Sequence, residues 1–254
     1  MNQWTFHANR THPARKWLLA SLALLVLGIV CLFGSAQSWN AYRKSNRFYA
    51  KLSSLAVEEI PSEAQGSRVN FAALKEINPD TAAWLEVPGL ELSLPVVQAE
   101  DNKTYLHTGF DGQKNPNGCL FFSASSQNSV EDLYSVVYGH NIHDGAMFGR
   151  LTDYKDETFA RENATFTLCT PAGDKTCRIF SCHEVTDGEE VYAVDWQPGQ
   201  AYNEFLQGLQ EDSLVDFSTQ VSENSRVITL STCASSYGNN LKRFAVHAVV
   251  EEED

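Results

Sequence analysis

The sequence predicts a mostly β globular domain, a closed barrel or a sandwich, preceded by a membrane-spanning helix. Short runs rich in β-branched and aromatic residues recur along the C-terminal part of the chain, with Gly, Pro, Asn and Asp between them. Many short strands of this kind are typical of barrels and sandwiches. With 254 residues, 43% of them hydrophobic, the chain can bury one sizeable core.

The predicted membrane helix runs from Trp17 to Trp39 and contains no charged residue. A helix of this length crosses a hydrocarbon core of about 30 Å. We therefore expect a cytoplasmic head at 1–16 and a transmembrane anchor at 17–39. The alternative is a cleaved signal peptide with Gly34 and Ala36 at the cleavage site, although the apolar part of such a peptide is usually only about 7–15 residues long.

Charge is distributed unevenly along the chain. Residues 1–51 contain seven Lys and Arg and no Asp or Glu, so the remainder carries 12 basic and 32 acidic residues, a balance of −20. Such a surface disfavours nucleic acid and anionic lipid as partners. Basic residues flank the apolar segment on both sides, so the predicted orientation, with the C-terminal part outside, depends on the short head and the long acidic remainder.

The part of the chain after the anchor divides into a connecting segment and a catalytic domain. Residues 40–68 are expected to form a juxtamembrane helix and a linker, because Pro, Gly and Ser gather before residue 69. The domain is predicted to span 69–254, and a helix is expected around 201–211, where apolar residues recur at helical spacing. Seven runs are predicted to be strands: Leu92–Ala99, Gly118–Ala124, Ser135–Asn141, Thr165–Thr170, Thr176–Val185, Arg226–Cys233 and Arg243–Val250.

Six cysteines raise the question of disulfides. One of them, Cys31, lies in the apolar segment, which leaves an odd number outside it. Cys169 and Cys177 flank a Pro-Ala-Gly-Asp turn and could face each other across a hairpin. The alternative, which we favour, is that they are unpaired core cysteines, because a buried free cysteine behaves as a small hydrophobic residue.

Cys233 is the strongest candidate for a nucleophile. Side chains alternate along a strand, so Cys233 shares a face with Thr229 and Ser231 and ends the strand on its more polar side. The next strand begins ten residues later with Arg243, after a segment that contains Gly and Asn. In a hairpin, Arg243 would lie near Cys233, where a guanidinium lowers a thiol pKa and stabilises an oxyanion. The alternative is a surface arginine paired with a carboxylate.

A thiol nucleophile also needs a general acid and base, and histidine is the usual choice. His140 follows a predicted strand and so lies at a strand end, as Cys233 does. His247 is the main competitor, but it lies further along its strand from Arg243 and is expected to be a core or wall histidine. His143 and Asp144 follow His140, yet the sequence offers neither HExxH nor paired CxxC, so we expect no metal and no cofactor.

These stretches together resemble the sortases, membrane-anchored cysteine transpeptidases of Gram-positive bacteria, and within them class B. The resemblance is carried by Leu230-Ser231-Thr232-Cys233, by the following Arg243, and by Tyr138-Gly139-His140-Asn141 with Met147-Phe148-Gly149-Arg150-Leu151 just after it. A run of Pro95-Val96-Val97-Gln98 with Asp101-Asn102 and Tyr105-Leu106 adds to it. The similarity extends from about Asn78 to Val250.

The resemblance implies an eight-stranded closed β-barrel of the sortase type with short helices, in which the helix around 201–211 is an insertion between two late strands. It implies that Cys233, His140 and Arg243 form the catalytic triad and that Ser231 and Thr232 bind the peptide. The implied reaction cleaves the C-terminal sorting signal of a secreted protein, NPxT- or LPxT-like, after its Thr. The acyl group then passes to an amine of a cell-wall precursor or pilin.

Two other functions fit the same residues. A hydrolytic cysteine peptidase would use water in place of the amine, and a non-catalytic membrane-anchored module would use the acidic surface to recruit a cationic partner. Product analysis with and without an amine separates the first from a transpeptidase. Substitution of Cys233, His140 and Arg243 separates the second, which predicts no loss of function.

Overall fold

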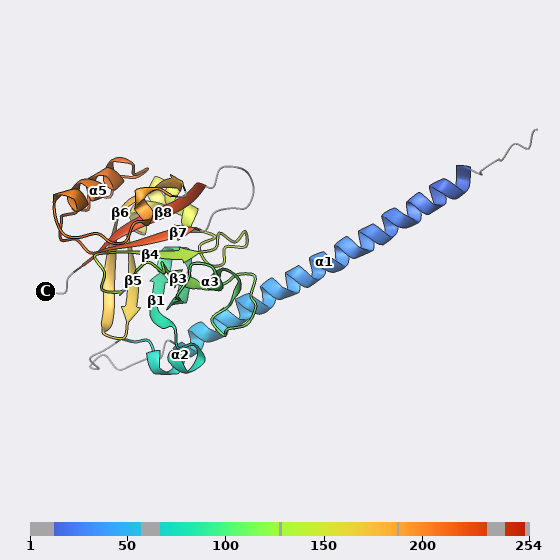
Figure 1. Ribbon diagram of the computed structural model, residues 1–254, viewed down its shortest axis with the longest axis horizontal. Coiled ribbons are helices and arrows are strands. Elements are labelled where there is room, and N and C mark those ends of the chain that lie inside the picture. The colour runs from blue at the N-terminus through green and yellow to red at the C-terminus, as the bar shows by residue number, and fades with distance from the viewer. Residues whose placement is uncertain (1–12, 57–66, 127–128, 187, 233–241, 252–254) are drawn as a thin grey trace, which may run out of the picture. The chain divides into compact units, whose positions relative to one another are not determined.

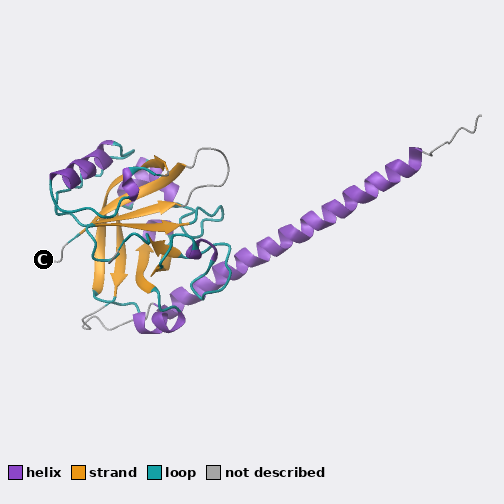
Figure 2. Ribbon diagram, in the orientation of Figure 1, coloured by secondary structure: helices purple, strands orange, loops and turns teal. Residues whose placement is uncertain are grey.

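The computed structural model describes the chain except residues 1–12, 57–66, 127–128, 187, 233–241 and 252–254. Eight strands close into a barrel in the order β1-β2-β3-β4-β7-β8-β6-β5 (Figures 1 and 2). This confirms the mostly β prediction and the closed barrel of eight strands. The strands are β1 Thr81–Val87, β2 Leu92–Gln98, β3 Leu120–Phe122, β4 Tyr134–Gly139, β5 Thr165–Thr170, β6 Gly173–Thr186, β7 Val227–Thr232 and β8 Lys242–Val250.

Helices and short 3-10 turns connect and cover these strands. The predicted insertion between two late strands is α5, which lies between β6 and β7 as expected. The helices are α1 Pro13–Ala56, α2 Phe71–Ile77, α3 Thr104–His107, α4 Glu157–Glu162 and α5 Gln200–Glu211, and the 3-10 turns are η1 Pro88–Leu90, η2 Leu151–Lys155 and η3 Glu190–Tyr192.

β1 is the strand that the pattern of short runs did not identify. Its sequence TAAWLEV contains two alanines, and only Ala82 and Glu86 are not fully buried. β1 pairs with β2 on one side and with β5 on the other. Because it is buried on both faces, it lacks the alternation of apolar and polar residues that marks a half-exposed strand.

Two of the neighbouring pairs in the barrel are parallel, and one of them joins strands that are far apart in sequence. β2 runs parallel to β3, and β4 runs parallel to β7, with Gly139 opposite Thr232 at the shared C-terminal end. β7 then pairs antiparallel with β8, as the predicted hairpin requires. The C-terminal ends of β4 and β7 therefore meet the N-terminal end of β8 at one rim of the barrel.

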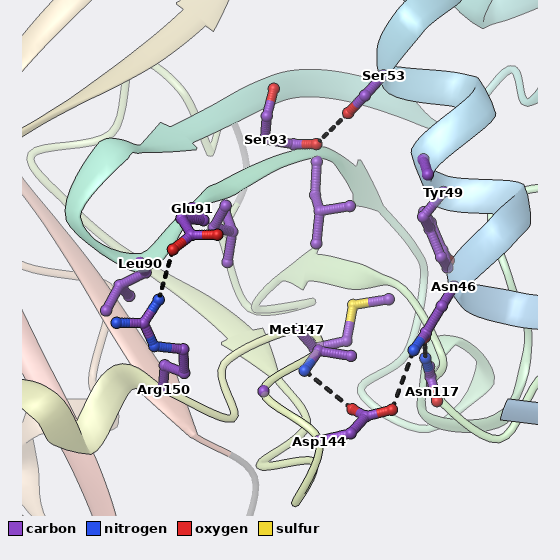
Figure 3. Close-up of a pocket in the computed structure, with 15 residues that line it drawn as sticks. Asn46, Tyr49, Ser53, Leu90, Glu91, Ser93, Asn117, Asp144, Met147 and Arg150 are labelled. Carbon is purple, nitrogen blue, oxygen red and sulfur yellow. Dashed lines mark hydrogen bonds and ion pairs between the residues drawn. The ribbon is translucent and has the colours of Figure 1, made fainter. Parts of the chain in front are cut away.

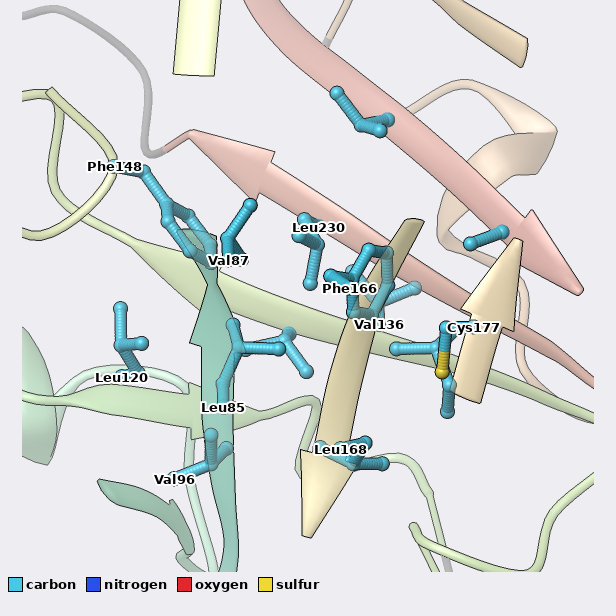
Figure 4. Packing of buried hydrophobic residues seen from close by; sticks show 14 of the residues in the cluster. Leu85, Val87, Val96, Leu120, Val136, Phe148, Phe166, Leu168, Cys177 and Leu230 are labelled. Carbon is cyan, nitrogen blue, oxygen red and sulfur yellow. The ribbon is translucent and has the colours of Figure 1, made fainter. Parts of the chain in front are cut away.

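The barrel interior is filled by aliphatic and aromatic side chains that point inward from all parts of the sheet (Figure 4). Leu85, Leu120 and Leu230 have no exposed surface. Gly139, the last residue of β4, faces this interior: a Cβ atom there would lie 2.6 Å from carbon atoms of Leu120 and Phe148. Glycine is therefore required immediately before His140, because the core leaves no room for a side chain.

Aromatic residues attach the α5 insertion to the outer face of the barrel. Trp196 stacks on Phe205 with the ring centroids 4.4 Å apart, and Phe205 meets Tyr134 of β4 edge to face at 5.4 Å. The hydroxyl of Tyr202 donates to the carbonyls of Leu133 and Ser225 at 3.1 and 2.9 Å. Packing of the apolar stripe thus explains why the helical spacing in the sequence predicted this element.

The compact unit that contains the barrel begins at Lys44, not near residue 69. The last turns of α1, residues 44–56, which we call the α1 foot, belong to it because Tyr49, Leu52 and Ala56 are buried. The Tyr49 hydroxyl donates to the carbonyl of Gly118 at 2.6 Å. The prediction that residues 40–68 form a juxtamembrane helix and a linker thus assigned the α1 foot to the connection rather than to the domain.

The part of α1 that precedes Lys44 belongs to a separate unit. From Trp17 onward this part of the helix is apolar, its large hydrophobic side chains are exposed, and its most apolar window has a mean hydropathy of 2.6. The helix is long and apolar enough to cross a membrane.

The five cysteines in the described residues are all free. Cys169 lies opposite Asp174, and Cys177 lies opposite Phe166, so the register of β5 and β6 separates the two thiols. Both are buried, and burial raises the pKa of each to about 12. These thiols are core residues, as the favoured interpretation of the sequence held.

Candidate active site

The candidate site lies on the outer face of the barrel, at the rim where β4, β7 and β8 meet. Tyr138 of β4 lies opposite Ser231 of β7, and Ser231 lies opposite Ala245 of β8, so these three residues form one row across the sheet. Residues two positions apart on a strand share a face. One row nearer the rim, the same face carries His140 after β4 and Arg243 on β8. On β7 the described residues end at Thr232, and the predicted nucleophile Cys233 lies outside them.

His140 is held by contacts with α3 and with the loop that follows β4. Its Nε2 lies 2.7 Å from the carbonyl oxygen of Leu106, and its backbone carbonyl accepts from the amide of Phe148 at 2.9 Å. A carbonyl only accepts hydrogen bonds, so Nε2 carries the proton in this contact and Nδ1 of the neutral ring is the basic nitrogen. His107 stacks on the same ring with the centroids 6.2 Å apart.

The electrostatic environment favours the neutral form of His140. Burial lowers its pKa from the ordinary value, the hydrogen bond to the Leu106 carbonyl opposes this, and the nearby His107 lowers the pKa further. Burial disfavours the charged form of the ring because water is removed from it. At neutral pH the side chain is therefore available to accept a proton, which is the state that a general base needs.

Two tyrosine rings surround the guanidinium of Arg243. Its Cζ lies 5.8 Å from the ring centroid of Tyr138 and 5.2 Å from that of Tyr192 in η3. The sequence did not assign a role to either tyrosine. Alternation along β4 places Tyr138 on the face of His140 and could have indicated it, whereas Tyr192 lies in a short turn without a periodic pattern.

Ser231 and Thr232 lie at the end of β7 and are buried. The Ser231 hydroxyl is 3.1 Å from the Tyr192 hydroxyl, and the Thr232 hydroxyl accepts from the amide of Phe244 at 2.9 Å. The polar face of β7 that the sequence indicated is thus a buried face covered by the insertion, and not a solvent face.

His247 lies away from the rim and belongs to the barrel wall. It has no exposed surface, its Nδ1 is 2.8 Å from the Thr229 hydroxyl, and it stacks on His183 at 5.0 Å. Burial, together with His183, lowers its pKa well below the ordinary value. The expectation of a wall histidine agrees with this position.

Asp144, which follows the candidate-site histidine in sequence, lines a different pocket of about 380 Å³ beside the α1 foot (Figure 3). Its carboxylate accepts from Asn46 at 3.0 Å, and Asn117 donates to Asn46 at 2.8 Å. Among the described residues, no group of three His, Cys, Asp or Glu side chains is placed to hold a metal ion.

Comparison with known proteins gives a consistent family. A sortase domain model matches residues 85–251. The chain is 25% identical over 237 residues to sortase B of Staphylococcus aureus, covering 92% of this chain and 97% of that protein. It is 28% identical over 225 residues to sortase B of Listeria monocytogenes, covering 86% of this chain and 91% of that protein.

Solved structures agree. The structure described as a Staphylococcus aureus sortase B-substrate complex matches with a TM-score of 0.77 at 25% identity, covering 84% of this chain and 98% of that one. The family model covers more than half of the chain, and the eight-stranded barrel is shared. The chain therefore belongs to the sortase family and is a class B sortase, a cysteine transpeptidase.

Proposed function

We propose that the protein cleaves the C-terminal sorting signal of a secreted protein after Thr and transfers the acyl group to an amine of a cell-wall precursor. Cys233 is the nucleophile, His140 the general acid and base, and Arg243 the stabiliser of the oxyanion. The observation that carries the proposal is the pairing of β4, β7 and β8, which brings His140 and Arg243 to the rim at which Thr232 ends β7.

The register supports the placement of Cys233. Arg243 lies two residues before Ala245, whose partner Ser231 lies two residues before Cys233. His140 directly follows Gly139, whose partner Thr232 directly precedes Cys233. We extend this register by one residue to assign Cys233 to the same row.

The two steps of the reaction need one proton carrier. In the first, the Cys233 sulfur attacks the Thr carbonyl carbon as His140 Nδ1 takes the thiol proton, and the guanidinium of Arg243 stabilises the resulting oxyanion. The C–N bond then breaks, and His140 gives its proton to the departing amine. In the second step the incoming amine attacks the thioester, His140 accepts the amine proton, and the sulfur of Cys233 leaves.

Ser231 and Thr232 complete the proposed site as residues that bind the peptide. Their hydroxyls are engaged with Tyr192 and with the Phe244 amide. We therefore assign their part in peptide binding to the backbone at this end of β7, and not to free hydroxyl groups.

We further propose that residues 17–39 remain as an anchor and that the catalytic domain lies outside the membrane. Exposed apolar side chains along this part of α1 support the anchor. The amine acceptor is present on the outer side of the membrane, where cell-wall precursors are used, so this orientation brings enzyme and acceptor together.

The proposal is tested with the full chain in detergent micelles, an NPxTG-type or LPxTG-type peptide and triglycine as the amine. Triglycine is chosen because one of the similar solved structures is described as a sortase B complexed with a peptide of three glycines. We expect a thioacyl adduct on Cys233 by intact mass and an amide product with triglycine. Cys233→Ala should abolish both, and His140→Ala or Arg243→Ala should reduce adduct formation by at least about 100-fold. Absence of the adduct with every sorting peptide contradicts the proposal.

The same reaction without an amine separates a transpeptidase from a hydrolase. A transpeptidase accumulates the acyl-enzyme until triglycine is added, whereas a peptidase releases the free acid at the same rate in both samples. Four other cysteines, Cys119, Cys169, Cys177 and Cys182, are buried, and burial raises their pKa to about 11 or 12. An adduct that maps to any of them would contradict the assignment, because their thiolate forms are scarce at neutral pH.

A further inference from the structure

The environment of Arg243 is built from two parts of the chain. Tyr138 comes from β4, and Tyr192 comes from η3, within the insertion between β6 and β7. The Arg243 Cζ and the two ring centroids form a triangle with sides of 5.2, 5.8 and 6.0 Å, and the two ring planes are inclined by 28°. The guanidinium therefore rests against both rings, within the distance at which a cation is attracted to an aromatic ring.

Hydrogen bonds at two neighbouring residues fix the turn that carries Tyr192. Its hydroxyl lies 3.1 Å from the Ser231 hydroxyl on β7. The carbonyl of the preceding residue, Val191, accepts from the Tyr134 hydroxyl at 3.1 Å. The Tyr134 hydroxyl in turn accepts from Thr229 at 2.8 Å. The turn that carries Tyr192 is thus tied to β4 and to β7.

The helix of the insertion supports the same turn. Phe205 of α5 packs edge to face on the Tyr134 ring at 5.4 Å, and Trp196, which follows η3, stacks on Phe205 at 4.4 Å. A continuous set of aromatic contacts therefore leads from α5 through Tyr134 to the segment that holds Tyr192.

We propose that Tyr192 is a positioning residue for Arg243, and that the insertion between β6 and β7 fixes the guanidinium at the rim through it. This inference rests on the role of Arg243 in the proposed function. Arginine has a long side chain with several rotatable bonds, so an unsupported guanidinium would occupy many orientations. Contact with two fixed rings restricts it to the orientation that the oxyanion needs, before the substrate arrives.

The test compares Tyr192→Leu, which removes the ring, with Tyr192→Phe, which keeps the ring and removes the hydroxyl. Acyl-enzyme formation is measured in a single turnover with an NPxTG-type or LPxTG-type peptide over a range of concentrations. Tyr192→Leu should lower the limiting acylation rate roughly 3- to 30-fold and change the half-saturating peptide concentration little. Tyr192→Phe should stay within about threefold of the wild type. Glu190→Gln, an exposed change in the same turn, is the matched control and should match the wild type.

A double-mutant cycle identifies the residue through which Tyr192 acts. In the Arg243→Gln background, Tyr192→Leu should have less than about a twofold further effect, because the interacting partner is already missing. A purely structural role would give the same loss in both backgrounds together with a lower melting temperature, and a role in peptide binding alone would raise the half-saturating concentration at an unchanged limiting rate. Either result overturns the inference.

A second measurement does not depend on catalysis. The Nε–Hε resonance of Arg243, assigned by its loss in Arg243→Gln, should be displaced by the ring currents of the wild type and return toward the value of a free arginine in Tyr192→Leu. If this shift occurs in a wild type that forms no acyl-enzyme, the proposed function fails and the positioning role stands. If the resonance is the same in both proteins, the positioning role fails, whether or not the enzyme is active.

Discussion

The two faces of β7 are equally buried but are stabilised by different interactions. Ile228 and Leu230 point into the barrel, and Thr229 and Ser231 point outward under the insertion, yet none of the four has exposed surface. The inner face is held by the burial and close packing of apolar groups. The outer face is held by hydrogen bonds among Thr229, Tyr134 and His247 and between Ser231 and Tyr192. The two faces are therefore expected to respond to different changes. Loss of apolar volume should disrupt the inner face, and loss of a hydrogen-bonding partner or addition of a buried charge should disrupt the outer face.

The largest effect is expected when an inner residue is shortened. Leu230→Ala removes a fully buried side chain from a close-packed interior and should lower the free energy of unfolding by about 2–5 kcal/mol. Urea denaturation at neutral pH measures this. Leu214→Ala is the matched control, because that leucine is 56% exposed and its loss should cost less than about 0.5 kcal/mol. Equal losses in the two variants would contradict the assignment of Leu230 to the core.

Acid should weaken the outer face selectively. Burial lowers the pKa of His247 well below its ordinary value, and burial also lowers the pKa of His183, which stacks on it. No acceptor among the described residues lies within hydrogen-bonding distance of His247 Nε2, so a proton added there would be buried without a partner. The unfolded chain takes up protons near pH 6.5, and the folded chain does so only at lower pH.

Stability contributed by neutral His247 is therefore complete above about pH 6.5 and is lost as the pH falls below it. Between about pH 7.5 and 5.0 the free energy of unfolding should decrease by about 2 kcal/mol for this residue alone. Urea denaturation at the two pH values measures this decrease. The control is His143→Gln, at an exposed position, which should show the same decrease as the wild type. A protein that is equally stable at both pH values would show that the outer face tolerates charge.

An intermediate effect is expected when one hydrogen-bonding group on the outer face is replaced without a change of shape. Thr229→Val keeps the volume but removes the hydroxyl that contacts Tyr134 and His247, both at 2.8 Å. It should cost about 1–2 kcal/mol in the free energy of unfolding, because buried polar groups lose a partner. Thr165→Val, at an exposed position of β5, should be nearly neutral. If both variants are neutral, water or another group replaces the hydroxyl.

The smallest effect is expected at a solvated cluster of charges. Glu184 accepts from Lys155 at 2.7 Å and from Lys242 at 3.0 Å, and these two lysines lower its pKa to about 2. The carboxylate side chain is 42% exposed, so water screens the charges and Glu184→Gln should cost at most about 1 kcal/mol. Any stabilisation from the cluster should disappear as the pH falls from about 4.5 toward 2 and at high salt. A loss of several kcal/mol would place this cluster with the buried interactions.

The same contrast explains which parts of the fold the sequence could predict. The apolar stripe of α5 and the antiparallel pairing of β7 with β8 were predicted correctly, because each depends on the spacing of residues that are close together in the sequence. β1 was missed because it is buried on both faces and carries no alternation. In the α1 foot, Tyr49, Leu52 and Ala56 lie at helical spacing and are buried, so the sequence did contain a sign of a buried helix face. The residues that this face contacts are distant in the sequence, as the hydrogen bond from Tyr49 to Gly118 shows.

The candidate site shows the same limit. The strand-end position of His140 was readable, but its proximity to the end of β7 depends on the parallel pairing of β4 with β7, which no local pattern reports. The strand-end positions made His140 a candidate base for Cys233, and the family resemblance implied that the two belong to one triad. Tyr192 could not be found from the sequence, because a single aromatic residue in a three-residue turn has no spacing to interpret. The assignment of Cys233 as nucleophile stays a prediction.

The parallel pairing of β4 with β7 also has a kinetic consequence. Residues 140 to 226, which include β5, β6 and α5, lie between the two strands in the chain, so their contact closes one of the longest loops in the barrel. Contacts of high sequence separation form late and slow folding. We therefore expect His140 and the end of β7 to meet late in folding. During refolding, enzymatic activity should return with the last phase of barrel closure, and a partly folded chain would not yet be an active acyltransferase.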